Sequence, residues 1–241
     1  MRIPRIFTLS NMASGQSIEL EAQASHYLSK VLRMQTDAAL ILFNNQGGEF
    51  DANIVSIAKK SVSVVIGEHR SDNRQSPLSV HLGIAMSKGD RMDWVMQKAT
   101  ELGASEITPL YTERTELKLK ADRADKKHSH WHNIIISACE QCQRNLLPQL
   151  HQPSNLQDWI NSTQADKKLV LHHRNSQQLN PADSPSSAAI LIGPEGGLSD
   201  SEIQLAEAQG FSALSLGPRV LRTETAPLVA LTLLQSLWGD I

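Results

Sequence analysis

The sequence predicts an α/β protein in which a small β-rich domain precedes a mostly parallel sheet covered by helices. From residue 78 onward, short apolar runs alternate with helical patterns, and this alternation indicates a parallel sheet. Before residue 72, runs rich in Val, Ile and Phe are separated by turn residues, as in a β domain. Two strand–loop–helix units in tandem fill residues 188–238, and ligands of parallel sheets sit at the carboxyl ends of strands.

Length, charge and cysteine content limit the class of protein. The 241 residues, 40% of them hydrophobic, can build one large or two modest cores. A net charge of −2 excludes a general polyanion binder, so any contact with nucleic acid requires local basic patches. No apolar run approaches ~18 residues and no signal-peptide core is present, so we expect a soluble, cytoplasmic protein without a membrane segment. Cys139 and Cys142, the only cysteines, lie three apart on one predicted helix, which fits a reducing compartment.

Residues 1–72 are predicted to form the small β-rich domain. The strands fall at 39–43, 49–57 and 61–66, with Gly-, Asn- and Lys-rich turns between them. One helix, 21–34, interrupts them with apolar residues at helical spacing. We therefore expect a compact β-barrel with one helix.

Four basic residues of this domain are candidate RNA contacts: Arg2, Arg5, Lys30 and Arg33. Lys30 and Arg33 are three apart, so on a helix they would share a face and could reach neighbouring phosphates. The alternative is an ordinary solvated face, because acidic and basic residues are close to balance in this domain.

The polar, proline-containing stretch 71–77 is predicted to be a linker, and residues 73–241 to be the second domain. Its strands are expected at 78–86, 106–111 and 168–172, and its helices at 92–102, 122–144 and 156–161. No Gly-x-Gly-x-x-Gly motif follows the first strand, which argues against a Rossmann-type cofactor site.

Two tandem units complete the domain. The strand 188–192 leads into a Gly-Pro-Glu-Gly-Gly loop and a helix, 200–209, that Ser199 and Glu202 open as a capping box and Gly210 ends. The strand 213–216 leads into a second loop and the helix 226–238, which is apolar nearly all round and should be buried.

The chemistry of these two loops favours a flat ligand. Glycines without a Cβ allow the backbone to bend sharply and to approach a ring closely. Pro194 and Pro218 remove amide donors that a phosphate cradle would need, so an adenine ring fits better than a pyrophosphate. The alternative is that both are tight turns in which glycine is required only for steric reasons.

The segments 191–199 (LIGPEGGLS) and 216–226 (LGPRVLRTETA) resemble the signature loops of SPOUT-class RNA methyltransferases. More closely they resemble the RsmE family, which methylates N3 of a uridine in 16S ribosomal RNA of the small subunit. The similarity continues upstream in 88–94 (KGDRMDW), 97–103 (QKATELG), 107–110 (ITPL) and 138–142 (ACEQC), and it covers essentially the whole chain.

The resemblance implies a PUA-like N-terminal domain that docks on RNA, a C-terminal trefoil knot, S-adenosylmethionine as methyl donor and a homodimer that buries the last helix. Helix 226–238 is consistent with such an interface. By resemblance the cofactor contacts are Leu171, His172, Ile192, Gly193, Glu195, Gly196, Leu216, Gly217, Leu221, Arg222, Thr225 and Ala226. His173 stands where the family pattern has proline, which puts the exact contacts of Leu171 and His172 at the end of strand 168–172 in doubt.

Methylation of uracil N3 requires loss of the imide proton and stabilisation of negative charge on the flanking carbonyls. Arg222 is the candidate cation for that charge, and the alternative is a structural arginine paired with Glu224 or a neighbouring carboxylate. Glu101 and Glu140 are candidates for a general base or a base-orienting group, and the alternative for each is a solvated carboxylate.

By resemblance, Arg91, Arg114 and Arg144 are candidate contacts to RNA or to the active site. Residues 114–127 hold six Lys or Arg against three Asp or Glu, a second basic patch suited to phosphate positioning, although single lysines there could serve solubility alone. No metal is expected: Cys139 and Cys142 lie within a helical run rather than a tight turn, and His128 is eleven residues from the nearer cysteine.

The sequence therefore predicts an S-adenosylmethionine-dependent methyltransferase for a uridine N3 of 16S ribosomal RNA. Two alternatives remain: a related enzyme that modifies another RNA position, and a non-catalytic ribosome-assembly factor that binds RNA.

Overall fold

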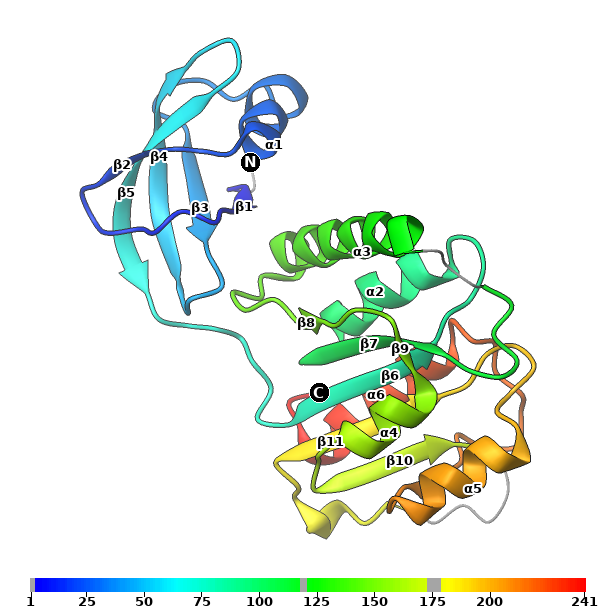
Figure 1. Cartoon of the computed structure of the whole chain (residues 1–241). Helices are drawn as coiled ribbons and strands as arrows, with labels where there is room; N and C mark the ends of the chain where they lie inside the picture. The colour runs from blue at the N-terminus through cyan, green and yellow to red at the C-terminus, as the bar shows by residue number, and fades with distance from the viewer. Residues whose placement is uncertain (1–2, 118–120, 173–178) are drawn as a thin grey trace. The chain divides into compact units, whose positions relative to one another are not determined.

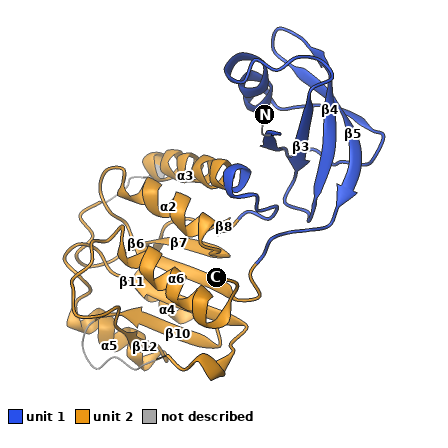
Figure 2. Ribbon diagram, turned by 180° about the vertical axis from the view of Figure 1, so that it is seen from behind, with its two compact units in different colours: residues 1–75, 139–147 blue, residues 76–138, 148–241 orange. Residues whose placement is uncertain are grey.

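A computed structural model describes residues 3–117, 121–172 and 179–241, the side chain of Ala121 excepted. The chain divides into two compact units (Figure 2). Unit 1 comprises Met1–Gln75 and Cys139–Leu147, and unit 2 comprises Ser76–Ala138 and Pro148–Ile241. The segment Cys139–Leu147 belongs to unit 1 although it lies far along the chain, and the sequence did not indicate this return.

Unit 1 is a five-stranded sheet with one helical segment (Figure 1). Its elements are β1 (Arg5–Phe7), β2 (Ser17–Glu19), α1 (Ala22–His26), the π-helix η1 (Tyr27–Val31), β3 (Ala39–Phe43), β4 (Glu49–Ile57) and β5 (Val62–Arg70). The strand order is β1-β3-β4-β5-β2, with β1 and β3 parallel and the other pairs antiparallel. Ile6 of β1 and Ile18 of β2, at the two edges, belong to one core, so the sheet curls around it.

The helix predicted over 21–34 is shorter than expected. α1 continues directly into the π-helix η1, and Arg33 then adopts a left-handed conformation with φ 50°. A single left-handed residue ends a right-handed helix because its backbone turns out of the helical path. Lys30 and Arg33 are both exposed, but they do not share a helical face, so that part of the prediction was wrong.

Unit 2 is an α/β unit, as predicted. Its elements are β6 (Ser79–Ala85), α2 (Arg91–Glu101), β7 (Glu106–Tyr111), α3 (Ala121–Cys142), β8 (Gln149–Leu150), β9 (Ser154–Asn155), α4 (Leu156–Ser162), β10 (Lys167–Leu171), the 3-10 helix η2 (Pro181–Asp183), β11 (Ser187–Ile192), α5 (Asp200–Ala208), β12 (Ser212–Leu214) and α6 (Ala226–Trp238). The strand order is β12-β10-β11-β6-β7-β8, with β9 beside β7, and every pairing is parallel.

Helices cover both faces of this sheet (Figures 1 and 2). On one face α4 and α5 pack against Ala189 and Leu191 of β11. The alternate residues Ala188, Ile190 and Ile192 are equally buried and point to the other face, where α2 contacts α6. Burial on both faces explains why β11 is a continuous apolar run rather than an alternating pattern.

The topology brings four strand ends to one edge of the sheet. Ile84 of β6 lies beside Ile192 of β11, and Leu171 of β10 lies beside Leu214 of β12. Because all these strands are parallel, the loops after β6, β10, β11 and β12 leave from the same edge. The predicted trefoil knot stays a prediction. In the described part of the chain, no helix has the length and apolar character that a membrane crossing needs.

Candidate active site

The predicted cofactor contacts lie on three loops that follow three adjacent strands. Leu171 ends β10 and His172 follows it, Ile192 ends β11 and residues 193–196 follow it, and residues 216–226 follow β12. β10 lies between the other two, and the backbone N–H of His172 donates to Leu214 O at 3.1 Å, which extends the pairing of β10 with β12 beyond the strands. The fold therefore gathers all twelve predicted contacts at one edge of the sheet.

The first loop, residues 193–199, is a tight turn with a close internal contact. The N–H of Gly197 donates to Pro194 O at 2.9 Å, and Gly197 has φ 68°, a conformation that favours glycine. A Cβ at Gly193 would lie 2.9 Å from Cγ of Leu198, a buried residue, so that glycine is required for packing.

Two other segments hold this loop in place. Arg114 donates from Nη1 to Gly196 O at 2.7 Å and to Leu198 O at 3.3 Å. Glu202, in the first turn of α5, accepts from the N–H groups of Ser199 and Glu113, both at 2.8 Å. The Ser199 side chain accepts in turn from Glu202 N, so the predicted capping box is confirmed. The Glu113 contact is an addition that sequence spacing does not reveal.

The second loop, residues 215–225, closes at the start of α6. The N–H groups of Thr225 and Ala226 both donate to Arg222 O at 2.9 Å. The hydroxyl of Ser87, which follows β6, donates to Oγ1 of Thr223 at 3.3 Å. The side chain of Arg222 is exposed, and no ion pair joins it to Glu224 in the described part of the chain. In this conformation Arg222 and Glu224 are therefore not paired.

Arg91 contacts both loops from the first residue of α2. Its Nη1 forms a salt bridge with Glu195 of the first loop, and its Nε lies 3.8 Å from a carboxylate oxygen of Glu224 in the second loop. The side chains of Arg91 and Glu195 are each 41% exposed, so the pair is partly solvated. Arg91 and Arg114, both predicted as RNA or active-site contacts, are thus bonded to the loops themselves.

An open cavity of about 800 Å³ lies where these contacts meet. Its lining residues are Lys88, Gly89, Asp90, Arg91, Trp94, Glu116, Glu195 and Glu224. The indole of Trp94 is 48% exposed, which is unusual for so large an apolar side chain. The sequence pattern assigned no role to Trp94, although it ends the motif 88–94.

The loops fit S-adenosylmethionine by their shape and composition. At Gly197 and Gly217, both with positive φ, the position of a Cβ would have no atom within 4 Å, so open space lies above the bare backbone. Leu171, Leu216 and Leu221 are half-buried and offer apolar surface for a purine ring and a methionine chain. Backbone amides and carbonyls near these glycines can bond the edge of a ring that lies against them.

Neither of the two candidate bases belongs to these loops. Glu101 is at the far end of α2, roughly 15 Å along the helix from Arg91, and both its carboxylate oxygens accept from Lys98 Nζ at 2.8 Å. Glu140 belongs to unit 1, where it accepts from Phe7 N at 3.0 Å. Burial raises the pKa of Glu140, while the Phe7 N–H and the charge of Arg5 act in the opposite direction. Glu101 therefore lies at the end of α2 opposite to Arg91, and Glu140 belongs to the other unit.

Two of the predicted RNA contacts are buried in unit 1. Arg5 is 7% exposed and bonds Glu49 and Asn145, and Arg144 is 5% exposed and donates to Gln75 Oε1 at 3.1 Å. Buried guanidinium groups bonded inside the unit stabilise it and do not meet RNA phosphates, which corrects both predictions. Arg2 lies outside the described residues.

Glu49 is the buried anion that neutralises Arg5. It also contacts Arg70 at 3.1 Å and Arg74 at 3.0 Å. Burial alone would raise the pKa of Glu49, but the hydrogen bonds of Arg74 and Arg5 and the charge of Arg5 outweigh it and lower the pKa to about 2. The carboxylate therefore stays ionised at all physiological pH values.

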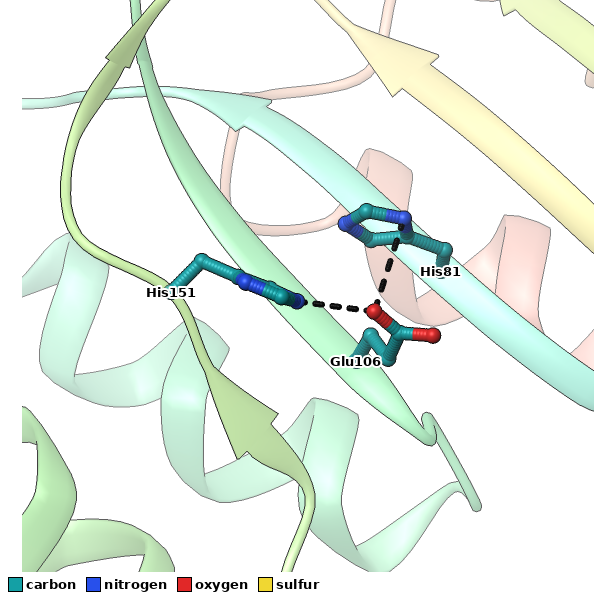
Figure 3. A group of neighbouring side chains, drawn as sticks. All are labelled: His81, Glu106 and His151. Atoms are coloured by element: carbon teal, nitrogen blue, oxygen red, sulfur yellow. Dashed lines mark hydrogen bonds and ion pairs between the residues drawn. The ribbon is translucent and has the colours of Figure 1, made fainter. Parts of the chain in front are cut away.

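Three potential metal ligands meet at the opposite edge of the unit 2 sheet (Figure 3). Glu106 Oε2 lies 2.7 Å from Nε2 of His151 and 3.9 Å from Nδ1 of His81. Trp159 donates from Nε1 to Nε2 of His81 at 3.1 Å. Because an indole N–H can only donate, Nε2 must accept, and Nδ1 of the neutral ring then carries the proton and faces Glu106. That tautomer has no lone pair at Nδ1 for a metal, so the group is a hydrogen-bonded network in this arrangement.

Comparison with known proteins agrees with the two units. A family model described as an RNA methyltransferase domain matches residues 74–235, and one described as an RNA methyltransferase PUA domain matches residues 20–67. The chain is 38% identical to ribosomal RNA small subunit methyltransferase E of Buchnera aphidicola subsp. Acyrthosiphon pisum, over 99% of this chain and 95% of that one. It is 32% identical to the Bacillus subtilis protein of the same name, over 93% and 92%.

Two solved structures are similar over the full length of both chains. A methyltransferase from Legionella pneumophila, in complex with the cofactor SAM, is 45% identical with a TM-score of 0.97. A ribosomal RNA small subunit methyltransferase E from Neisseria gonorrhoeae, bound to S-adenosyl methionine, is 34% identical with a TM-score of 0.93.

Proposed function

Since the chain belongs to the ribosomal RNA small subunit methyltransferase E family, we propose that it methylates N3 of a uridine in 16S ribosomal RNA with S-adenosylmethionine as donor. The observation that carries the proposal is the convergence of three loops, after β10, β11 and β12, on one edge of a parallel sheet. Their residues are those that the family resemblance assigns to the cofactor.

The donor would be held by the backbone of Gly193–Gly197 and Gly217 and by the apolar side chains at the strand ends. When bound, S-adenosylmethionine supplies a methyl group on a positively charged sulfur. The protein must hold the acceptor nitrogen in line with that methyl group, because orientation supplies a large part of such a rate enhancement. Arg114, Glu202 and Arg91 fix the two loops that would do so.

Arg222 is proposed to act on the acceptor. Loss of the imide proton leaves negative charge on the uracil carbonyls, and a permanent cation next to them lowers its energy. Arg222 is suited to this because its backbone is fixed by two hydrogen bonds while its side chain is exposed. Glu101 has no supporting geometry for the role of base, and Glu140 is bonded to Phe7 within unit 1.

Unit 1 is proposed to dock the enzyme on folded RNA, with the exposed Lys30 and Arg33 as phosphate contacts. A net charge of −2 gives the whole chain no general affinity for RNA, so such local contacts must provide it. Because the proposed substrate is ribosomal RNA, the cytoplasm is the proposed location.

A homodimer is part of this proposal. On α6, Val229, Leu233 and Leu237 recur every four residues on one side of the helix and are not fully buried, with Val229 39% exposed. A partly exposed apolar stripe on an otherwise buried helix suits an isologous contact with a second copy.

Nucleoside mass spectrometry of 16S ribosomal RNA from a strain that lacks this gene tests the proposal. N3-methyluridine should be absent from 16S RNA and should return with the wild-type gene but not with Arg222→Ala. An unchanged level of N3-methyluridine would rule the proposal out. Loss of a modification from another RNA would favour the alternative of a related enzyme that modifies a different RNA position. If the purified protein does not bind S-adenosylmethionine, the alternative of a non-catalytic ribosome-assembly factor is favoured.

A further inference from the structure

We infer that the cavity beside Arg91 receives the pyrimidine ring of the target nucleotide, which stacks on Trp94. The inference rests on the proposed function and adds the subsite for the acceptor base. A base inside folded RNA must leave its stack before an enzyme can methylate it, and a protein that takes it out must offer a surface in exchange.

Trp94 is the side chain that offers such a surface. The sequence has four tryptophans, all within the described residues, and Trp131, Trp159 and Trp238 are at most 9% exposed. Trp94 is 48% exposed and lines the cavity three residues after Arg91, so both side chains project from the same side of α2. An indole presented at a polar cavity is a stacking platform for a planar base.

The charged walls of the cavity match the edge of uracil. That edge presents a carbonyl, an N–H and a second carbonyl, so it needs donors on either side of an acceptor. The lining offers Lys88 as a donor and Glu195 and Glu224 as acceptors, and Arg91 holds the two carboxylates in place.

The position of the cavity supports the assignment. Glu195 belongs to the first loop and Glu224 to the second, so the cavity shares two walls with the proposed donor site. A ring stacked on Trp94 therefore lies next to the loops that hold the methyl group, and the second of these loops carries Arg222 two residues before Glu224. The charged lining distinguishes this cavity from the apolar stripe of Val229, Leu233 and Leu237, which is the better surface for a second copy of the chain.

The test compares Trp94→Ala and Trp94→Phe with the wild type in methyl transfer to an unmodified 16S RNA transcript or to small subunits that lack the mark. Loss of one base–aromatic stack weakens binding by about 5- to 150-fold. Trp94→Ala should raise KM for RNA or lower kcat/KM in that range, while Kd for S-adenosylmethionine changes less than about twofold. Trp94→Phe, which keeps an aromatic ring, should recover most of the activity.

Ile241→Ala is the control for truncation of a surface side chain. Ile241 is an exposed apolar residue of unit 2 that does not line the cavity.

A second readout follows from the burial of the other three tryptophans. Quenching of the fluorescence by acrylamide should report mainly Trp94, and the RNA transcript should protect it. An unchanged kcat/KM for Trp94→Ala would overturn the subsite, and so would acrylamide quenching that RNA does not reduce. Dissociation of a wild-type dimer by Trp94→Ala would also overturn it, because Trp94 would then belong to the contact between two copies. These outcomes concern the Trp94 variants and leave the activity of the wild type intact. If the wild type itself transfers no methyl group to 16S RNA, the proposed function fails, so the two failures are distinguishable.

Discussion

Arg91 shows how one residue can organise a site without touching the chemistry. Its guanidinium contacts one carboxylate from each of the two signature loops, Glu195 and Glu224, which are 29 positions apart in the sequence. Arginine suits this task because its planar group carries donors in several directions and remains charged. We therefore assign Arg91 a positioning role in donor binding rather than a direct contact with RNA phosphates.

Substitution of Arg91 by Ala should weaken S-adenosylmethionine binding by roughly two- to tenfold, since each partly exposed ion pair is worth at most about 1 kcal/mol. Isothermal titration calorimetry measures the change. Arg123→Ala removes an exposed arginine of α3 and should leave Kd unaltered. An Arg91→Ala variant that binds the donor as tightly as the wild type, yet loses RNA affinity, would contradict the positioning role.

His81 makes folding stability depend on pH. Burial lowers its pKa from 6.5 to about 4, an effect that the charge of Glu106 opposes and His151 reinforces. Because the folded pKa lies below the unfolded one, the unfolded state binds the proton first as the pH falls. The stability that neutral His81 contributes is thus present above about pH 6.5 and is lost as the pH falls towards 4.

Urea unfolding of the wild type and His81→Gln at several pH values checks this. The glutamine carbonyl can still accept from Trp159 but does not titrate. The difference in unfolding free energy between the two proteins should shrink from pH 7 to pH 4 by at most about 3 kcal/mol. If the free energies of unfolding of the two proteins change in parallel with pH, His81 is not the cause of the pH dependence.

The roles and contacts of single residues were the least predictable from the sequence. The residues predicted to bind the cofactor lie at one edge of the sheet, because the order of strands and loops determines it, and their role stays a prediction. Whether an arginine is exposed depends on tertiary partners, and so Arg5 and Arg144 were misassigned to RNA. The contact of Arg91 with Glu195 crosses 104 residues and has no local signal. Trp94 could have been noticed as a large aromatic residue within a polar motif.

At the scale of elements, α5 and the first loop act together through Glu202. This carboxylate is 6% exposed and accepts from Ser199 and Glu113, so it joins the helix start to the segment that carries Arg114. Arg114 then bonds the carbonyls of Gly196 and Leu198. The loop conformation therefore depends on a residue that does not belong to it.

Removal of this link by Glu202→Ala should lower the free energy of unfolding by about 2–3 kcal/mol, because half of the capping box is lost and the N–H of Glu113 loses its partner. Donor affinity should fall as well. Chemical denaturation and calorimetry measure the two effects, and Gln204→Ala, on the exposed side of α5, is the matched control. A stable variant with normal donor affinity would disprove the coupling.

Most elements were predictable because local signals agree with the fold. The bounds of β3, β4, β7 and α6 match the predicted ranges, and Gly210, with φ 84°, follows α5 as expected. The π-helix η1 was not predictable, since an apolar helical pattern does not specify which backbone carbonyl each N–H will reach. The return of Cys139–Leu147 to unit 1 depends on long-range bonds such as that between Asn145 and Glu49.

At the scale of the molecule, the predicted fold class is confirmed: an α/β methyltransferase unit of SPOUT type with a parallel sheet and a PUA-like N-terminal unit. The sequence alone supplied the alternation of strands and helices. The PUA-like character and the knot were implied only by resemblance, because periodicity cannot show how a chain threads.

Assembly is tested by substitution of the exposed stripe on α6. Val229→Asp places a charge on that stripe and should convert a dimer into a monomer, as sedimentation velocity would show. Val55→Asp, at a similarly exposed valine of β4, should leave the mass unaltered. A wild-type protein that sediments as a monomer would remove the homodimer from the account.

The most direct test of the central claim is methyl transfer by the purified protein. Unmodified small ribosomal subunits would be incubated with S-adenosylmethionine labelled in its methyl group, and the nucleosides of 16S RNA analysed by mass spectrometry. The label should appear in N3-methyluridine with the wild type and be strongly reduced with Arg222→Ala. Label in any other nucleoside, or equal transfer by both proteins, would contradict the account.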